Sequence, residues 1–389
     1  MTKTRLAIVF DPPEEGWASM DLIGAAILDG FADRDPAEVV AERVCPPYRP
    51  RFARWPVVGR RGAARNADRL INRMWDYPRA LATIAGRRDF DLYHLVDHSY
   101  SQLVHVLPEG RAVVTCHDLD TFRCLLEPEH EPRPRWFRAM TGRILDGLRR
   151  AAAVACDSAA TRDALIAHGI QPADRAHVVY LGIHSDFSHL PNPHADASAD
   201  VFLGPRRPGA PPDILHVGSN IPRKRVDVLL DVFAAIRRTM PGARLIKIGG
   251  ALPPELERRA VALGVADAIV TLPFLDRAVV AAVYRRAALV LQPSAAEGFG
   301  LPVAEALACG VPLLASDIPV LREIGGDAPS YRPVGAIAAW TDAALFLLHE
   351  PPTASDARRT AGIARAQLFS WTSHVDRLAE IHREVLSRI

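Results

Sequence analysis

The stretch ALVLQPSAAEGFGLPVAEALAC, residues 288–309, holds a strand, a glycine turn and the beginning of a helix in direct succession. The apolar run ALVLQ indicates a buried strand, and Pro302 suits the first turn of a helix. Gly298 and Gly300 let the backbone of the turn approach a ligand closely, and the N-terminus of the helix favours an anion. The stretch therefore predicts a strand-to-helix unit of an α/β fold, with an anion site at its turn.

Two acids, Glu297 and Glu305, stand on either side of this turn. A carboxylate accepts hydrogen bonds from pairs of hydroxyls, so acids on both sides of a phosphate-binding turn suit a ligand with hydroxyls on both sides of its phosphates. A nucleotide sugar has this layout. Alternatively, Glu305 caps its own helix and Glu297 is a solvated loop residue. The stretch taken alone leaves both interpretations open.

A second anion site is predicted in HVGSNIPRKRVDVLLDVF, residues 216–233, where Gly218 follows a strand and three cations precede a helix. The chain has three lysines, at positions 3, 224 and 247, so the other 44 of its 47 basic residues are arginine. A lysine in such a chain is favoured where a compact charge is needed. We interpret Lys224 as a ligand contact and Arg225 as a solvated surface residue.

Working outward, short apolar runs alternate with segments of helical period on both sides of a proline-rich stretch near residue 190, which is typical of parallel sheets covered by helices. A chain of 389 residues with 49% hydrophobic residues is large enough for two cores. We therefore predict an α/β fold with two Rossmann-like domains and a ligand site in the cleft between them, formed by loops that follow strands. The expected parts are a first domain at 1–190, a linker at 191–212, a second domain at 213–370 and an amphipathic helix at 371–389.

With these segments together, the chain resembles the retaining GT-B glycosyltransferases of family 4. EGFGLPVAE (297–305) looks like the E-x7-E motif of the family, and VGSNIPRKRVDVLLDVF (217–233) resembles its diphosphate-binding loop. TLPFLDRAVVAAVYRRAALVLQPS (271–294) looks like the stretch that lines its nucleoside pocket. The resemblance implies the GT-B fold, in which two Rossmann-like domains face each other across a cleft and the C-terminal helix crosses back to the first domain.

The resemblance also implies roles for individual residues. Glu305 would hold the ribose hydroxyls, Glu297 would contact hydroxyls of the transferred sugar, and Lys224 would help to neutralise the leaving diphosphate. Many members carry arginine directly after the loop glycine, where this chain has Ser219, and Arg223 would take its place. The implied catalytic residues are His117, Glu297, Arg223 and Lys224. The implied donor-binding residues are Gly16, Gly218, Ser219, Arg223, Lys224, Gly249, Pro273, Phe274, Leu275, Glu297, Gly298, Phe299, Gly300, Leu301 and Glu305.

In the first half of the chain, AVVTCHDLDTFR (112–123) places His117 just after a buried strand. This is similar to the histidine of the family that lies near the reacting sugar, although a histidine at a strand end also serves structural roles. We interpret His98 as structural. Asp118 and Asp120 formally match the DxD motif of metal-dependent transferases, but so short a motif recurs by accident. Because arginine, lysine and a helix dipole can balance a diphosphate, we expect no essential metal and no cofactor.

A basic segment at 47–69 carries seven arginines against one acid, interleaved with Tyr48, Phe52 and Trp55, and RPRWFR at 133–138 repeats the composition. Basic residues with aromatics suit an anionic membrane surface or a lipid-pyrophosphate acceptor, whereas a solvated arginine-rich face is the equal alternative. The net charge of +2 speaks against a nucleic-acid partner. Since the start lacks a signal peptide, we expect a cytoplasmic protein, with contact to the inner membrane face left open. The five scattered cysteines are expected to be free thiols.

The predicted function is retaining transfer of a sugar from a nucleotide diphosphate sugar, GDP- or UDP-linked, to a hydroxyl acceptor that is a lipid-linked or polysaccharide intermediate. Two alternatives stay open. One is a catalytically silent GT-B protein that binds a nucleotide or sugar as a partner subunit. The other is a nucleotide-sugar hydrolase or epimerase on the same fold. The donor base, the sugar and the acceptor are not readable from the residues.

Overall fold

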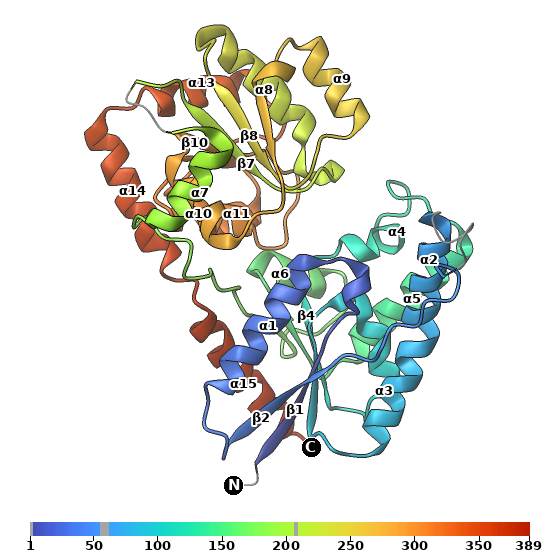
Figure 1. Ribbon diagram of the computed structural model, residues 1–389. Coiled ribbons are helices and arrows are strands. Elements are labelled where there is room, and N and C mark those ends of the chain that lie inside the picture. The colour runs from blue at the N-terminus through green and yellow to red at the C-terminus, as the bar shows by residue number, and fades with distance from the viewer. Residues whose placement is uncertain (1–2, 55–61, 206–208) are drawn as a thin grey trace. The chain divides into compact units, whose positions relative to one another are not determined.

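The computed structural model describes residues 3–54, 62–205 and 209–389. The chain forms two compact units, which Figure 1 shows as separately covered sheets. Unit 1 consists of Met1–Leu181 together with Trp371–Ile389, and unit 2 consists of Gly182–Ser370. Each unit contains one six-stranded sheet in which all paired strands are parallel. The predicted α/β fold with two Rossmann-like domains is thereby confirmed.

The sheet of unit 1 has the strand order β2-β1-β3-β4-β5-β6. Its strands are β1 (Thr4–Val9), β2 (Val39–Val44), β3 (Leu92–Leu95), β4 (Ala112–Cys116), β5 (Ala153–Cys156) and β6 (Ala176–Val178). Its helices are α1 (Ala18–Ala32), α2 (Gly62–Ile71), α3 (Tyr77–Gly86), α4 (Arg123–Leu126), α5 (Arg135–Arg150), α6 (Ala159–Ala167) and α15 (Trp371–Leu386). A 3-10 helix at His98–Val106 follows β3 and packs on α5.

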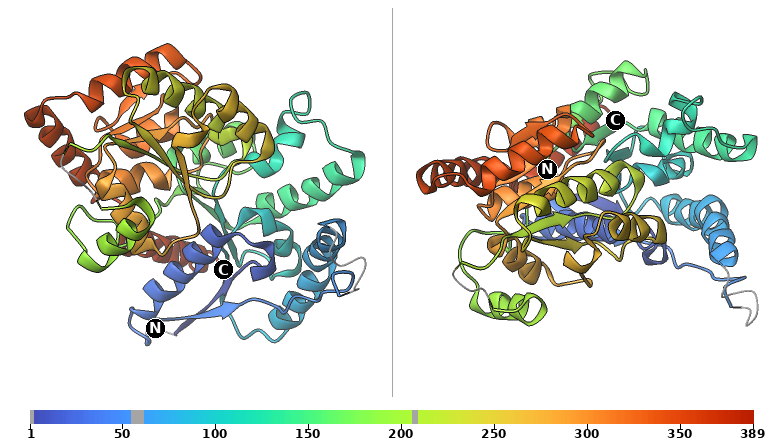
Figure 2. Two further views of the ribbon diagram at one scale, coloured as in Figure 1. Left: turned by 45° about the horizontal axis from the view of Figure 1, so that its top comes forward. Right: turned by 90° about the horizontal axis from the view of Figure 1, so that it is seen from above.

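The sheet of unit 2 has the strand order β12-β11-β10-β7-β8-β9. Its strands are β7 (Asp213–Val217), β8 (Arg244–Ile248), β9 (Ile269–Leu272), β10 (Leu289–Gln292), β11 (Leu313–Ser316) and β12 (Ser330–Arg332). Its helices are α7 (Pro193–Leu203), α8 (Val226–Thr239), α9 (Pro254–Ala262), α10 (Arg277–Arg286), α11 (Leu301–Ala308), α12 (Pro319–Gly325), α13 (Ile337–Leu348) and α14 (Pro352–Ala366). Figure 2 shows this sheet between its helices, and the loops after β7, β8, β9 and β10 emerge at its carboxyl edge.

The expected linker at 191–212 is wrong, because this range contains α7. Ala195, Ala199 and Leu203 lie four residues apart on one face of the helix and are buried, and α7 packs on α10. Two ion pairs reinforce the packing, from Arg285 to Asp196 and from Arg286 to Asp200, each at 2.6 Å. The division between the units falls instead after Leu181.

The last helix, α15, belongs to unit 1 although the residues before it belong to unit 2, as expected for a C-terminal helix that crosses back. It packs on α1 and contacts β5. Its His382 is buried, stacks on Phe31 and lies 2.9 Å from the ring of His94 on β3. Burial lowers the pKa of His382 to about 3 and lowers that of His94 well below its usual value. Both imidazoles are therefore neutral where α15 meets the sheet.

Acidification is expected to loosen α15 from unit 1. Both histidines stay neutral in the folded state at pH 5.5, whereas in the unfolded state they are protonated below about pH 6.5. Each should therefore lower the free energy of unfolding by about 1.4 kcal/mol at pH 5.5. Hydrogen exchange of the α15 amides at pH 7.5 and 5.5, corrected for the intrinsic rate, measures this loss. His382→Leu should remove part of the pH effect, whereas His168→Leu, at an exposed position, should retain all of it. An α15 whose protection does not change with pH would contradict this account.

No helix in the described ranges is both long and apolar enough to cross a membrane.

Candidate functional site

The two loops predicted to bind an anion lie against each other in unit 2. β7 and β10 are neighbours in the sheet, so the loops that follow them leave the same carboxyl edge. The backbone N–H of Ala295 donates to the carbonyl of Arg223 at 2.7 Å, and the Arg223 guanidinium donates to the carbonyl of Ala296 at 3.2 Å. Two segments that are 73 residues apart in the sequence thus form one structure.

Glu297 is the centre of a polar network in this structure, and its side chain is only 5% exposed. The Lys224 ammonium donates to both carboxylate oxygens, at 2.6 and 2.8 Å. Burial raises the pKa of Glu297, but Lys224 and the surrounding donors outweigh burial and lower it overall. Glu297 is therefore an ionised, buried carboxylate. The other groups around it are Ser294 Oγ at 2.7 Å, Gln292 Nε2 at 2.9 Å and Arg223 at 3.6 Å.

Glu305 lies on α11 and has a different environment. Its carboxylate accepts a hydrogen bond from the Tyr284 hydroxyl of α10 at 3.0 Å. Burial raises the pKa of Glu305 to about 7, against the lowering effects of Tyr284 and the Arg277 charge. The two glutamates therefore differ in protonation, because Glu297 has a cation partner at hydrogen-bond distance and Glu305 does not have one among the described residues.

The glycine turn between the glutamates is sterically fixed. Gly300 has φ 92°, and a Cβ at this position would come within 2.7 Å of Leu321. Phe299 is buried and packs edge-on against Phe369, with ring centroids 5.5 Å apart. Gly298, the first glycine of the turn, is buried, and α11 begins at Leu301, directly after the turn. The turn thus presents its backbone at a helix N-terminus.

The remaining residues expected at a donor site follow β7, β8 and β9 at the same edge of the sheet. Gly249 has φ 116°, and a Cβ there would lie 2.2 Å from the carbonyl oxygen of Gly218, so the loops after β7 and β8 touch through their glycines. Ser219 directly follows Gly218. Phe274, between Pro273 and Leu275, is 91% exposed and offers an open aromatic face.

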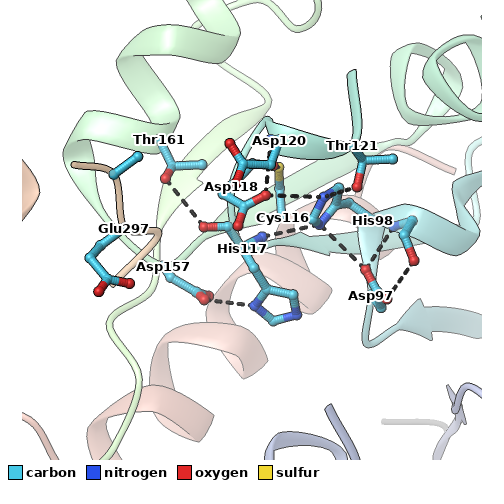
Figure 3. Close-up of polar contacts among 12 residues, drawn as sticks. Asp97, His98, Cys116, His117, Asp118, Asp120, Thr121, Asp157, Thr161 and Glu297 are labelled. Carbon is cyan, nitrogen blue, oxygen red and sulfur yellow. Dashed lines mark hydrogen bonds and ion pairs between the residues drawn. The ribbon is translucent and has the colours of Figure 1, made fainter. Parts of the chain in front are cut away.

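In unit 1, His117 follows β4 at the carboxyl edge, as the sequence predicted. Figure 3 shows its ring pointing toward Asp157, which follows β5. Nδ1 of His117 lies 2.7 Å from the Asp157 carboxylate, and Nε2 lies 2.8 Å from the carbonyl oxygen of Val96. Because a carbonyl oxygen only accepts hydrogen bonds, Nε2 must carry a proton. The ionised carboxylate likewise requires a proton on Nδ1.

His117 is therefore an imidazolium ion whose two N–H groups are both engaged within unit 1. Burial lowers the pKa of His117, but the carboxylates of Asp157 and Asp97 outweigh burial and raise it to about 9. His98, the neighbouring histidine, accepts a bond from the backbone N–H of His117 at 3.3 Å and lies beside Asp97. In this arrangement His117 is a positive charge and a donor. It has no lone pair with which to act as a base.

Replacement of Asp157 by asparagine is expected to lower the pKa of His117 by about two units, because an opposite charge at this distance is removed. Titration of the His117 ring by NMR measures the pKa directly. Asp163→Asn is the matched control, since Asp163 is exposed on α6 and pairs with Arg162. An unchanged His117 pKa in Asp157→Asn would show that Asp157 does not set the charge.

Two other predicted features of unit 1 have local roles in the structure. Gly16, with φ 74°, ends a short 3-10 helix after β1, and the Arg69 guanidinium holds this loop through the carbonyl of Glu14 at 2.8 Å. Asp118 Oδ1 accepts a bond from the backbone N–H of Asp120 at 3.0 Å, which closes a turn after β4.

Asp68, the single acid of the basic segment at 47–69, fixes the backbone of residues 51–53 through hydrogen bonds. The Asp68 carboxylate, fully buried, accepts bonds from the backbone N–H groups of Arg51, Phe52 and Ala53 at 2.8 to 3.0 Å. Arg51 also forms a two-bond ion pair with Asp76. Part of this segment is thus structural. Trp55, with two of the seven arginines, lies outside the described residues. In the second basic stretch Trp136 is 61% exposed.

Four polar residues of these sites were not identified from the sequence: Gln292, Tyr284, Asp157 and Lys247. A signal exists for three of them, since Lys247 is one of only three lysines in this arginine-rich chain. Gln292 ends an otherwise apolar strand, and Asp157 follows β5 as His117 follows β4. Tyr284 and Lys247 lie within a helix and a strand, where their sequence neighbours give no indication of their partners.

Comparison with known proteins was made for both units. Residues 204–362 match the family model described as "Glycosyl transferases group 1", and residues 28–187 match "Glycosyltransferase Family 4". Over 203 residues the chain is 35% identical to a D-inositol 3-phosphate glycosyltransferase of Segniliparus rotundus, covering 50% of this chain and 44% of that protein. The chain thus spans about half the length of the curated relatives it matches.

Among solved structures, a sucrose-phosphate synthase from Thermosynechococcus elongatus superposes with a TM-score of 0.76 at 18% identity, over 99% of this chain and 100% of that one. Anabaena HepE, solved in complex with UDP and glucose, has a TM-score of 0.72 at 18% identity, over 99% and 100%. These similarities establish the fold alone. The two family models between them match both units, so the chain belongs to the group 1 glycosyltransferases, family 4, and the structural similarities show that it has the GT-B fold.

Proposed function

We propose that the protein is a glycosyltransferase that moves a sugar from a nucleotide diphosphate sugar to a hydroxyl acceptor, with retention at the anomeric carbon. The single observation that carries the proposal is the joined structure of the loops after β7 and β10. It places Lys224 and Arg223 beside Glu297, next to a glycine turn that opens a helix. Cations, a helix N-terminus and a carboxylate are the groups that a sugar diphosphate requires.

In this proposal the donor changes the partners of Lys224. Its ammonium is bound to Glu297 in the structure, and a diphosphate would draw it away and leave the Glu297 carboxylate free for hydroxyls of the sugar. Arg223 and Lys224 would then stabilise the negative charge that develops on the leaving diphosphate, which is where transferases of this kind gain most of their rate. Since these cations balance the diphosphate, no essential metal is proposed.

His117 would act as a fixed positive charge on the acceptor side, since both of its ring nitrogens carry protons. The proton of the acceptor hydroxyl would then go to a phosphate oxygen of the donor. UDP- and GDP-linked sugars are the proposed donors, and UDP is the nucleotide present in the HepE neighbour. The proposed acceptor is a glycan or a lipid-linked intermediate.

A thermal-shift screen of UDP, GDP, ADP and their sugars identifies the donor, and release of the nucleoside diphosphate from that donor then tests the reaction. Release that requires an added hydroxyl acceptor supports the transferase. Release that proceeds equally without any acceptor would support a hydrolase, and an interconverted sugar would support an epimerase. Binding without turnover toward any acceptor would support the silent binding protein that Ser219 leaves conceivable.

Peripheral binding to an anionic membrane is proposed for the basic faces around Phe52 and Trp136, because both aromatic rings are exposed among arginines. Flotation with vesicles that contain or lack phosphatidylglycerol tests it. Binding that depends on the anionic lipid, and weakens in Trp136→Ala, supports the proposal. Flotation that is independent of lipid charge, or absent, would leave these surfaces as solvated faces.

A further inference from the structure

Lys247 is the one fully buried lysine of the described chain, and it lies on β8 beneath the glycine loops of unit 2. Its ammonium donates to the carbonyl oxygens of Gly218 and Gly250, each at 3.2 Å. Among the described residues, no carboxylate forms an ion pair with it. A buried charge that has only carbonyl partners is unusual, because burial penalises an ammonium unless an opposite charge compensates it.

The position of Lys247 is set by the close approach of two loops. The carbonyl oxygen of Gly218 accepts the hydrogen bond from the Lys247 ammonium and also lies against Gly249. A Cβ on Gly249 would come within 2.2 Å of this oxygen. Lys247 therefore fixes the backbone after β7 and after β8 at once. These are the loops that contribute Gly218, Ser219 and Gly249 to the proposed donor site.

The buried carboxylate of these loops does not compensate Lys247. Glu297 instead faces Lys224 and Arg223. His216, buried under the same loop, adds no charge of either sign. Its Nδ1 donates to the carbonyl of Leu291 at 3.0 Å, and burial lowers its pKa to about 4. Because Glu297 is engaged by other cations, the positive charge of Lys247 is left for a diphosphate to neutralise.

We infer that Lys247 is a positioning residue of the diphosphate site, which holds the Gly218 and Gly250 loops and whose buried charge is compensated when a diphosphate binds. The inference rests on the proposed function and adds to it a residue that the glycosyltransferase motifs do not include. Lys247 acts through the loops and touches no reacting atom.

One consequence is a link between diphosphate binding and protonation. Burial lowers the pKa of Lys247 to about 8, so above this pH the empty site loses its ammonium. A bound diphosphate favours the charged form, and its own phosphates are fully ionised throughout this range. A tenfold preference of the diphosphate for the charged form corresponds to a rise of about one unit in the pKa of Lys247. Binding at pH 8.5 should therefore take up about half a proton, and affinity should fall about sixfold between pH 7.5 and 9.5.

The test is calorimetric titration of the whole protein with UDP, GDP and ADP at pH 7.5 and 9.5. For whichever diphosphate binds wild type, Lys247→Met should bind about tenfold more weakly at pH 7.5 and should show at pH 9.5 only the fall that ionisation of a uracil or guanine base contributes. Lys3→Met, at an exposed lysine of unit 1, should behave as wild type. Proton uptake by wild type at pH 8.5, measured in two buffers of different ionisation enthalpy, needs no variant and keeps the test valid if Lys247→Met does not fold.

Each outcome bears on a distinct statement. A pH-dependent loss of affinity that is larger in wild type than in Lys247→Met supports the inference. Binding by wild type without proton uptake, or an equal fall in Lys247→Met and wild type, overturns the role of Lys247 and leaves the proposed function standing. No binding of any of the three diphosphates at either pH overturns both.

Discussion

Replacing Glu297 by glutamine is expected to slow sugar transfer by about two to three orders of magnitude, because the proposed function has this charge contact the sugar in the transition state. Binding of the nucleoside diphosphate should be unchanged or tighter. The reason is that Lys224 donates to both oxygens of Glu297 in the structure and must leave this partner when the diphosphate arrives. Transfer rates at saturating donor, together with calorimetric titration of the diphosphate, measure the two effects.

Glu350→Gln is the matched control for this variant. Glu350 is also a buried glutamate of unit 2, with a side chain 4% exposed, and it accepts two bonds from Arg358. Each substitution leaves a cation without its carboxylate and should cost about 3 kcal/mol of stability or more. A Glu297→Gln enzyme that transfers sugar no more slowly than Glu350→Gln would contradict the assignment of Glu297.

Replacing Glu305 by alanine is expected to weaken nucleoside diphosphate binding about 10- to 100-fold, since the two charge-assisted hydrogen bonds proposed between Glu305 and the ribose hydroxyls would be lost. Transfer at saturating donor should change much less. The two glutamates thus have opposite expected signatures, one in binding and one in rate. Tyr284→Phe, which removes the hydroxyl that donates to Glu305 but keeps the ring, should weaken binding only a few-fold.

The pH dependence separates Glu305 further. Its pKa is raised to about 7, so the ionised carboxylate that is proposed to accept the two ribose hydroxyls is lost as the pH falls below 7. Wild type should therefore bind the diphosphate less tightly at pH 6 than at pH 7.5, beyond the change that the phosphates contribute. Glu305→Gln should retain only the phosphate contribution. Equal pH dependence in Glu305→Gln and wild type, or equal and negligible effects of both glutamate variants, would contradict the roles given to these residues.

The central strands of both sheets could be predicted from the sequence, whereas three of the four edge strands could not. β1, β4, β7 and β10 are buried on both faces and therefore appear as continuous apolar runs. The strands missed are β2, β6 and β12, which lie at sheet edges, are short or half-exposed, and lack such a run. α7 was missed for a different reason. Its buried face is built from two alanines and a leucine, which is a weak apolar pattern among prolines and polar residues.

The loops of the candidate site could be predicted because their residues are close in sequence and their glycines and prolines mark turns. The partners of those residues could not be predicted. Lys224 and Glu297 are far apart along the chain, and each was identified for its own motif rather than for the ion pair they form. The charge of His117 depends on Asp157, 40 residues away, which is brought to it by the pairing of β4 and β5. Such pairs form because the strands that carry them are neighbours in the sheet, and the order of strands in a sheet cannot be read from a single motif.

The most direct test of the central claim is calorimetric titration of wild type and Glu305→Ala with UDP, GDP and ADP at pH 7.5. We predict that wild type binds at least one of the three with a dissociation constant in the micromolar range, about −8 kcal/mol, and that Glu305→Ala binds the same nucleotide 10- to 100-fold more weakly. A folded wild-type protein that binds none of the three would contradict the assignment of the loops after β7 and β10 as a nucleotide-sugar site.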